Sequence, residues 1–235
     1  MATSGTRAWA LDIDEIIREA IELAGGEPAL GNDATTLIRS FNLLQTELTN
    51  RKINLFTLAP KTLTLSQGTA EYNIDATDVD VLNGSIRVGT GTAQSDSRID
   101  RAGFDLYASV SPKNAQGRPS IYYVQRGVTR PTVTFWPVPD QTYTFYYWVF
   151  QRFEDGTKLA QDPGVPFRFL PVLTNGLAYQ LARKRAAQTV DKGESQALEM
   201  RIQRLKAEYE EALEYATTED RERISTTVVP NLVTP

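Results

Sequence analysis

The chain has 235 residues, of which 41% are hydrophobic and 23% charged, a balance typical of folded proteins. It contains no cysteine and no histidine, which excludes disulfide bonds, Cys or His metal ligands, cysteine nucleophiles and histidine-dependent catalysis. The formal net charge of −4 argues against a basic surface that wraps DNA, whereas a channel in which DNA slides would favour neutral or acidic walls. No apolar run approaches the roughly 20 residues that span a bilayer, so no membrane partner is expected.

Two amphipathic helices are predicted near the N-terminus. In the first, Asp12 to Ala24, Asp12 and Glu15 have the spacing of a capping box, and Gly25-Gly26 ends the helix. The second runs from about Asp33 to Arg51 and has one apolar stripe, made of Leu37, Phe41, Leu44 and Leu48. A short loop rich in Gly, Pro and Asn joins the two helices, which predicts that they pack as a hairpin.

The run from Phe167 to Ala182 is predicted to be the central helix. Apolar residues recur at steps of three and four, Pro171 fits only near the start, and Arg183-Lys184-Arg185 follows at the end, where cations favour the helix dipole. Gly176 inside this helix predicts a close contact with another helix; the alternative is a glycine that the helix merely tolerates.

A last long helix is expected from about Glu194 to Glu222. Its heptad-like seam predicts that it lies along another helix or another subunit, and it consists of Leu198, Ile202, Leu205, Tyr209, Ala212 and Ala216. We therefore take two sets of residues as candidate subunit-packing positions: Leu198, Ile202, Leu205 and Tyr209 here, and Leu37, Phe41 and Leu44 in the second helix.

Between Pro60 and Phe150 the apolar period changes to two, which predicts about six strands. Thr62–Leu65 and Tyr72–Ile74 are expected to form a hairpin. Val79–Leu82 and Ser85–Val88 flank Asn83-Gly84, a strong tight-turn signal. The remaining three strands are expected at Ser120–Arg126, Thr132–Trp136 and Tyr143–Phe150, rich in aromatic and β-branched residues.

The predicted fold class is α+β, with a helical core of about four helices and an inserted antiparallel β-sandwich or small barrel. Residues 1–58 and 151–223 would form the helical domain, residues 59–150 the β-rich domain, and residues 224–235 an extended C-terminal tail. The tail has no charged side chain but exposes apolar ones unless another chain covers them, as in strand addition or groove insertion. Its candidate docking residues are Ile224, Val228, Val229, Pro230, Leu232 and Val233; the alternative is a frayed end.

No catalytic, cofactor or metal site is predicted. The carboxylate pairs Asp12/Asp14 and Asp78/Asp80 are explained by a helix start and by turns, although paired carboxylates could in principle hydrolyse a glycosidic bond. Trp136, Tyr143, Tyr146 and Trp148 could form a sugar-binding platform, but at strand spacing such aromatic residues are more often core or subunit contacts. A carbohydrate-binding or other tail module built on a β-sandwich is thus the alternative function.

Several short sequence segments, in the order in which they occur along the chain, resemble those of one known protein family. They are Leu43-Leu44-Gln45-Thr46-Glu47-Leu48 continuing to Leu58, Leu65-Ser66-Gln67-Gly68-Thr69-Ala70-Glu71-Tyr72, Val79-Asp80-Val81-Leu82, Gly117-Arg118-Pro119-Ser120-Ile121-Tyr122-Tyr123, Phe135-Trp136-Pro137-Val138-Pro139, Val165-Pro166-Phe167-Arg168-Phe169-Leu170-Pro171, Leu177-Ala178-Tyr179 and Glu219-Asp220-Arg221-Glu222-Arg223. Together they resemble the head-to-tail adaptor (head-completion or tail accessory) proteins of short-tailed bacteriophages.

This resemblance implies a structural virion protein in the head-tail connector, assembled in the host cytoplasm, and not an enzyme. Such adaptors commonly form a ring of twelve copies beneath the portal protein, extend the DNA channel and provide the platform for the tail. The implied partners are the portal protein, further copies of the chain, the tail nozzle or other tail proteins, and viral DNA that passes without sequence-specific binding. In that picture the C-terminal tail grips the portal, and Trp136 and Tyr143 are candidate contacts on the tail side.

Overall fold

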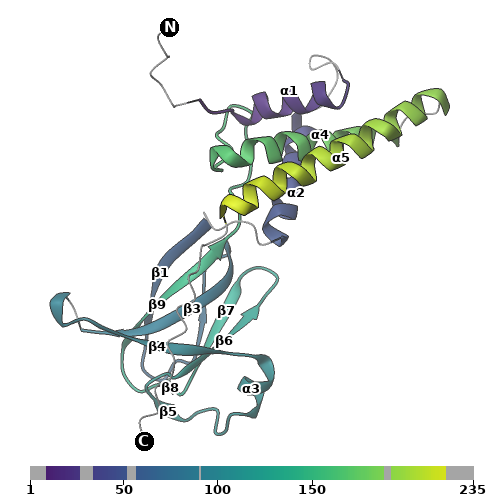
Figure 1. Ribbon diagram of the computed structural model, residues 1–235. Helices are drawn as coiled ribbons and strands as arrows, with labels where there is room; N and C mark the ends of the chain where they lie inside the picture. Colours follow the sequence, from purple (N-terminus) through teal and green to yellow (C-terminus); the bar gives the residue numbers. More distant parts are fainter. Residues whose placement is uncertain (1–8, 27–33, 52–56, 90, 188–191, 221–235) are drawn as a thin grey trace, which may run out of the picture. The chain divides into compact units, whose positions relative to one another are not determined.

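The computed structural model describes residues 9–26, 34–51, 57–89, 91–187 and 192–220 (Figure 1). The chain divides into two compact units, a helical unit in residues 1–45 and 156–235 and a β unit in residues 46–155. Helices and a curled sheet within one chain confirm the predicted α+β class.

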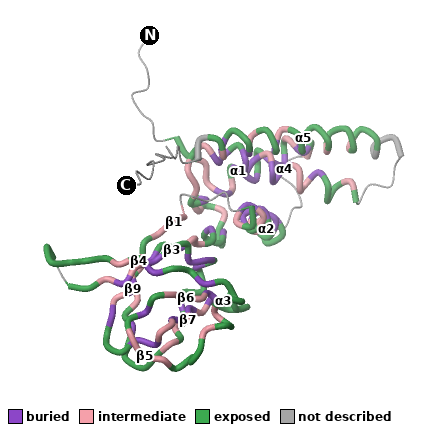
Figure 2. The backbone as a smooth tube through the Cα atoms, turned by 60° about the horizontal axis from the view of Figure 1, so that its bottom comes forward, coloured by how far each residue is buried: buried purple, intermediate pink, exposed green. Residues whose placement is uncertain are grey.

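The helical unit is built around α4 (Leu170–Ala186), which follows the one-turn 3-10 helix η3 (Phe167–Phe169). Both α1 (Ile13–Leu23) and α5 (Lys192–Asp220) pack along α4. The expected hairpin of α1 with α2 (Ala34–Asn50) is wrong, because the backbone of α1 runs close to α4 and not to α2. The physical reason is that α4 is apolar on most sides, and its buried residues are Leu170, Val172, Leu173, Thr174, Gly176, Leu177, Ala178 and Ala182 (Figure 2).

The start of α1 is fixed by the predicted capping box. The carboxylate of Asp12 accepts a hydrogen bond from the Glu15 N–H at 2.8 Å, and the Glu15 carboxylate accepts one from the Asp12 N–H at 3.1 Å. The N–H groups of Ile13 and Asp14 donate to the carbonyls of Gln161 and Leu159, each at 3.0 Å. The free N–H groups of the first turn are thus satisfied by side chains and by a distant loop.

Gly176 makes the predicted close helix contact, and it lies where α4, α5 and α2 meet. A Cβ at this position would lie 2.8 Å from the Tyr209 ring in α5 and 2.9 Å from a Leu44 methyl group in α2. Only a glycine lets these side chains approach the α4 backbone so closely. The seam of α5 therefore faces another helix of the same chain.

The β unit is a seven-stranded sheet that curls on itself. In spatial order its strands are β1 (Leu58–Leu65), β9 (Tyr143–Gln151), β3 (Asp78–Val88), β4 (Ser95–Ala102), β6 (Ile121–Arg126), β7 (Pro131–Trp136) and β2 (Glu71–Asn73). Every neighbouring pair is antiparallel except β4 and β6, which are parallel. The connection between β4 and β6 contains α3 (Phe104–Ser109) and β5 (Gln116–Gly117), which pairs with β8 (Val138–Pro139); η2 (Gly91–Ala93) lies between β3 and β4.

The curled sheet encloses an aromatic and aliphatic core. The Phe145 ring is its centre: it stacks on Tyr147 with centroids 4.8 Å apart and meets Phe135 edge-on at 4.9 Å. The buried members are Leu65, Ile74, Val81, Ile86, Ile99, Tyr122, Val124, Val133, Phe135, Tyr143, Phe145, Tyr147 and Val149.

Two predicted turns within the sheet are wrong. β1 pairs with β9 and β2 with β7, so the two strands lie at opposite ends of the strand order and do not form a hairpin. Asn83-Gly84 is not a turn either, because β3 runs continuously through it with bulges on either side of Asp80 and Val81. A Cβ at Gly84 would lie 2.2 Å from the Phe145 ring, so this glycine makes room for the core.

Candidate interaction surfaces

The carboxylates considered as catalytic pairs hold the fold together. Asp12 caps α1, and Asp14 forms an ion pair with Arg18 at 2.7 Å. In the described part of the chain, no group of three or more acidic residues is arranged to hold a metal ion.

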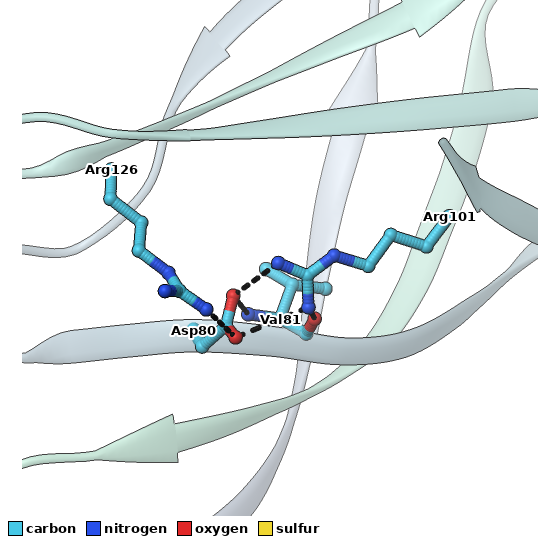
Figure 3. A network of polar contacts seen from close by, with 4 residues as sticks. All are labelled: Asp80, Val81, Arg101 and Arg126. Atoms are coloured by element: carbon cyan, nitrogen blue, oxygen red, sulfur yellow. Dashed lines mark hydrogen bonds and ion pairs between the residues drawn. The ribbon is translucent and has the colours of Figure 1, made fainter. Parts of the chain in front are cut away.

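Asp80 links three strands of the curled sheet (Figure 3). Its carboxylate accepts hydrogen bonds from Arg101 on β4, at 2.8 and 3.1 Å, and from Arg126 on β6, at 2.5 Å. Arg101 also donates to the Val81 carbonyl at 2.8 Å. Burial by itself would raise the pKa of Asp80, but the hydrogen bonds and charges of the two arginines outweigh it and lower this pKa. The charged carboxylate thus connects β3 to β4 and β6.

Asp78 is held by Lys61 on β1. The ammonium of Lys61 lies 2.8 Å from the fully buried Asp78 carboxylate and 2.6 Å from that of Asp75. Burial alone would lower the pKa of Lys61, but the hydrogen bonds to Asp75 and Asp78 raise it. Lys61 and Asp75 line a cavity of about 490 Å³, together with other residues of β1 and of the end of β2. The Gln151 side-chain amide also donates to the Asp78 carboxylate, at 3.2 Å. These contacts link β1 to β3 and to the segment that follows β2.

The aromatic residues of the sheet do not form a saccharide platform. Tyr143 is buried, and its hydroxyl donates to Asp140 at 2.7 Å. Trp136 is half-buried, and its indole N–H donates to the Pro112 carbonyl at 3.0 Å. The Arg87 guanidinium covers the Tyr146 ring at 4.3 Å, which leaves Trp148 as the exposed member of the four, at 38%. The alternative carbohydrate-binding function therefore has no geometric support in the described residues.

Most of the candidate subunit-packing residues fill the chain's own core. Leu198 and Ile202 are half-buried and are the two that keep surface for a neighbour. The five that are buried, and offer a neighbouring copy no surface in this structure, are Leu37, Phe41, Leu44, Leu205 and Tyr209. The candidate docking residues Ile224, Val228, Val229, Pro230, Leu232 and Val233 lie outside the described residues.

The helical unit has an apolar groove that sequence reasoning missed. It has a volume of about 760 Å³ and lies between α1 and the start of α4. Trp9 and Phe167 line it and are 71% and 75% exposed. Trp9 and Phe167 stand at helical steps of four and three from Ile13 and Leu170, so the pattern alone indicates burial and not an exposed groove.

The β unit exposes a second aromatic surface around α3. Phe104 and Leu106 are 68% and 53% exposed. Behind them Tyr107 stacks on Tyr123, with ring centroids 5.2 Å apart and an interplanar angle of 8°, and the Lys113 ammonium lies 4.1 Å from the Tyr107 centroid. The Phe104 ring also lies 6.3 Å from that of Tyr123, so exposed and stacked aromatic rings form one apolar cluster on this surface.

The described polar clusters thus tie strands together, and the two candidate interaction surfaces carry exposed aromatic residues. None of the described helices combines the length and apolarity needed to cross a bilayer. The chain belongs to the SU10 adaptor protein family, whose family model matches residues 11–231. It is therefore a bacteriophage adaptor protein, a virion component that contacts other virion components, which confirms the family indicated by the sequence phrases. A comparison with curated proteins found no match.

Proposed function

We propose that this adaptor forms a ring, of about twelve copies, that stacks beneath the portal, extends the DNA channel and carries the tail. The match to the adaptor family over residues 11–231 carries this proposal. Viral DNA passes through the ring without sequence-specific contacts, in keeping with a net charge of −4.

The two units have different roles in this proposal. The helical unit forms the ring body and meets the portal, and its C-terminal residues 224–235 grip portal subunits. The β unit faces the tail nozzle or other tail proteins, and the surface with Phe104 and Leu106 supports this role because it is exposed, apolar and next to stacked rings. Many modest contacts in a ring add up to firm attachment through avidity.

The contact between neighbouring copies includes the first half of α5. Leu198 and Ile202 keep part of their surface, and Met200 between them is 66% exposed. Half-buried residues beside an exposed methionine are suited to a helix contact that forms on assembly.

The test is cryo-EM of the purified chain mixed with the portal protein encoded alongside it, with the chain alone as the control. We expect a ring stacked on the portal, with density for residues 226–235 on portal subunits. Replacing Val229 and Leu232 by Asp should weaken the complex without unfolding the chain. Absence of any complex over a range of ionic strengths would contradict the proposed function.

A further inference from the structure

The apolar groove of the helical unit has the shape and chemistry to hold an extended peptide. Its apolar lining residues are Trp9, Leu11, Leu23, Phe167, Leu170 and Pro171. Charged side chains follow the α1 side, among them Glu15, Glu19 and Glu22. An apolar segment without charges would cover the apolar lining and leave these charged groups in water.

The helix α5, which precedes the C-terminal tail, contacts η3, an element that contributes to this groove. α5 runs back along α4, so that Tyr209 contacts Gly176 and the last turns of α5 lie next to η3, which contains the groove residue Phe167 (Figure 1). The buried Ala216 lies four residues before the end of α5 at Asp220, a distance of about 6 Å along the axis. Residues 221–235 that follow can reach up to about 50 Å when extended, more than enough to cover a groove on the same unit.

The sequence that follows matches the groove. Residues 224–235 contain no charged side chain and include Val228, Val229, Leu232 and Val233. Pro230 in the middle favours an extended backbone over a helix.

We propose that, in the free protein, the groove of α1 and α4 holds residues 224–235 of the same chain. The apolar residues of this segment are then covered before assembly. Residues 224–235 must leave the groove before they can bind portal subunits. The displacement step rests on the proposed function; the storage step is a property of the free chain.

The absence of cysteine in the chain allows a direct test by paired cysteines in the full-length protein. One variant carries Glu19→Cys in the groove and Val233→Cys in the tail. The control carries Glu211→Cys, an exposed position on α5 close to where the tail begins, with the same Val233→Cys. We expect a disulfide within one chain to form about tenfold faster in the groove pair than in the control pair, because docking raises the effective concentration of the two thiols.

A substitution in the groove separates docking from random tail contacts. Phe167→Glu in the groove pair should lower the rate to that of the control pair, whereas Phe104→Glu, at a similarly exposed aromatic residue of the β unit, should leave it unchanged. Equal rates in the two cysteine pairs, or equal effects of the two Glu substitutions, would overturn the proposal. Disulfides that link two chains would also overturn it, because they would place the tail on a second copy.

The portal assay distinguishes a failure of storage from a failure of the proposed function. If the groove stores the tail, Phe167→Glu should speed the binding of the chain to portal rings severalfold. If no portal complex forms but the groove disulfide does, the storage step stands and the proposed function fails. If the complex forms at the same rate with and without Phe167→Glu, displacement from the groove is excluded.

Discussion

Asp80 shows how much of the β unit depends on one side chain. It joins β3 to β4 and β6 through two guanidinium groups, so Asp80→Asn leaves two cations without their counter-charge. We expect a loss of about 1–3 kcal/mol in the free energy of unfolding near pH 7, measured in urea. Asp96→Asn, which breaks the exposed ion pair with Arg87, is the matched control and should cost less.

The Asp80→Asn variant also allows a test of how the charge of Asp80 makes stability depend on pH. Because the pKa of Asp80 is lower in the folded chain than the ordinary value of 3.8, its stabilisation is complete above about pH 4 and is lost as the pH falls through the folded pKa. The difference in stability between wild type and Asp80→Asn should therefore be constant from pH 5 to 7 and shrink below about pH 4. A difference that persists unchanged at pH 2 would show that the charge of Asp80 is not what stabilises the sheet.

Removal of the polar group of Tyr122, unlike removal of the Asp80 charge, is not expected to destabilise the sheet. Its ring is buried, its hydroxyl has no hydrogen-bond partner among the described residues, and burial raises its pKa to about 12. Tyr122→Phe should keep or increase stability, by up to about 1 kcal/mol, because an unpaired buried hydroxyl is removed.

An alkaline titration supplies the check for Tyr122. Above pH 10 the unfolded chain releases the Tyr122 proton before the folded chain does, so wild type should lose stability relative to Tyr122→Phe as the pH rises from 10 to 11. A clear loss of stability in the variant at pH 7 would mean that the hydroxyl has a partner.

Among the elements, α4 offers a test in which two effects oppose each other. Gly176→Ala gains about 1 kcal/mol of helix propensity but places a Cβ 2.8 Å from the Tyr209 ring and 2.9 Å from a Leu44 methyl group. Overpacking in a tight site costs about 1–3 kcal/mol, so we expect a net loss in thermal stability. Gln180→Ala, on the same helix but half-buried, should be nearly neutral. A more stable Gly176→Ala would mean that the helices can move apart at no cost.

A structural feature of an element can be predicted from the sequence when residues nearby in the chain cause it. The capping box of Asp12 and Glu15 and the close contact of Gly176 were predictable, because neighbouring residues or a break in a regular pattern indicate them. Gly84 was not, because the Phe145 ring that explains it comes from a strand 61 residues later in the chain. The strand order could not be predicted either, because β1 and β2 are close in sequence and yet each pairs with a strand far along the chain.

The candidate surfaces also depend on contacts between residues that are distant in the sequence. An apolar period indicates which residues are buried, and Leu205 and Tyr209 of α5 are indeed buried, but it does not tell whether the partner is α4 or another copy. Trp9 and Phe167 stand at helical steps from Ile13 and Leu170, so the period alone predicts their burial, and their groove exists only because α1 packs on α4 instead of α2.

At the scale of the whole molecule, the proposed function divides the contacts with the head and with the tail between the two units. The strands of the β unit pair only with one another, and the curled sheet has its own core. The helical unit has a different core around α4, and both the groove and the start of the C-terminal tail belong to it. In the proposed function, contacts with the head and with the tail can therefore change independently.

This separation predicts that the β unit folds alone and does not bind the portal. A fragment of residues 57–155 should show sheet-type circular dichroism and one cooperative unfolding transition, because all seven strands and their core are present. Added in excess, the fragment should leave the complex of the full chain with portal rings intact, as seen by co-sedimentation. It should compete with the full chain for tail proteins, and Phe104→Glu should remove this competition while the fragment stays folded. A fragment that bound the portal, or that competed equally well with Phe104→Glu, would show that the two units do not divide the head and tail contacts in this way.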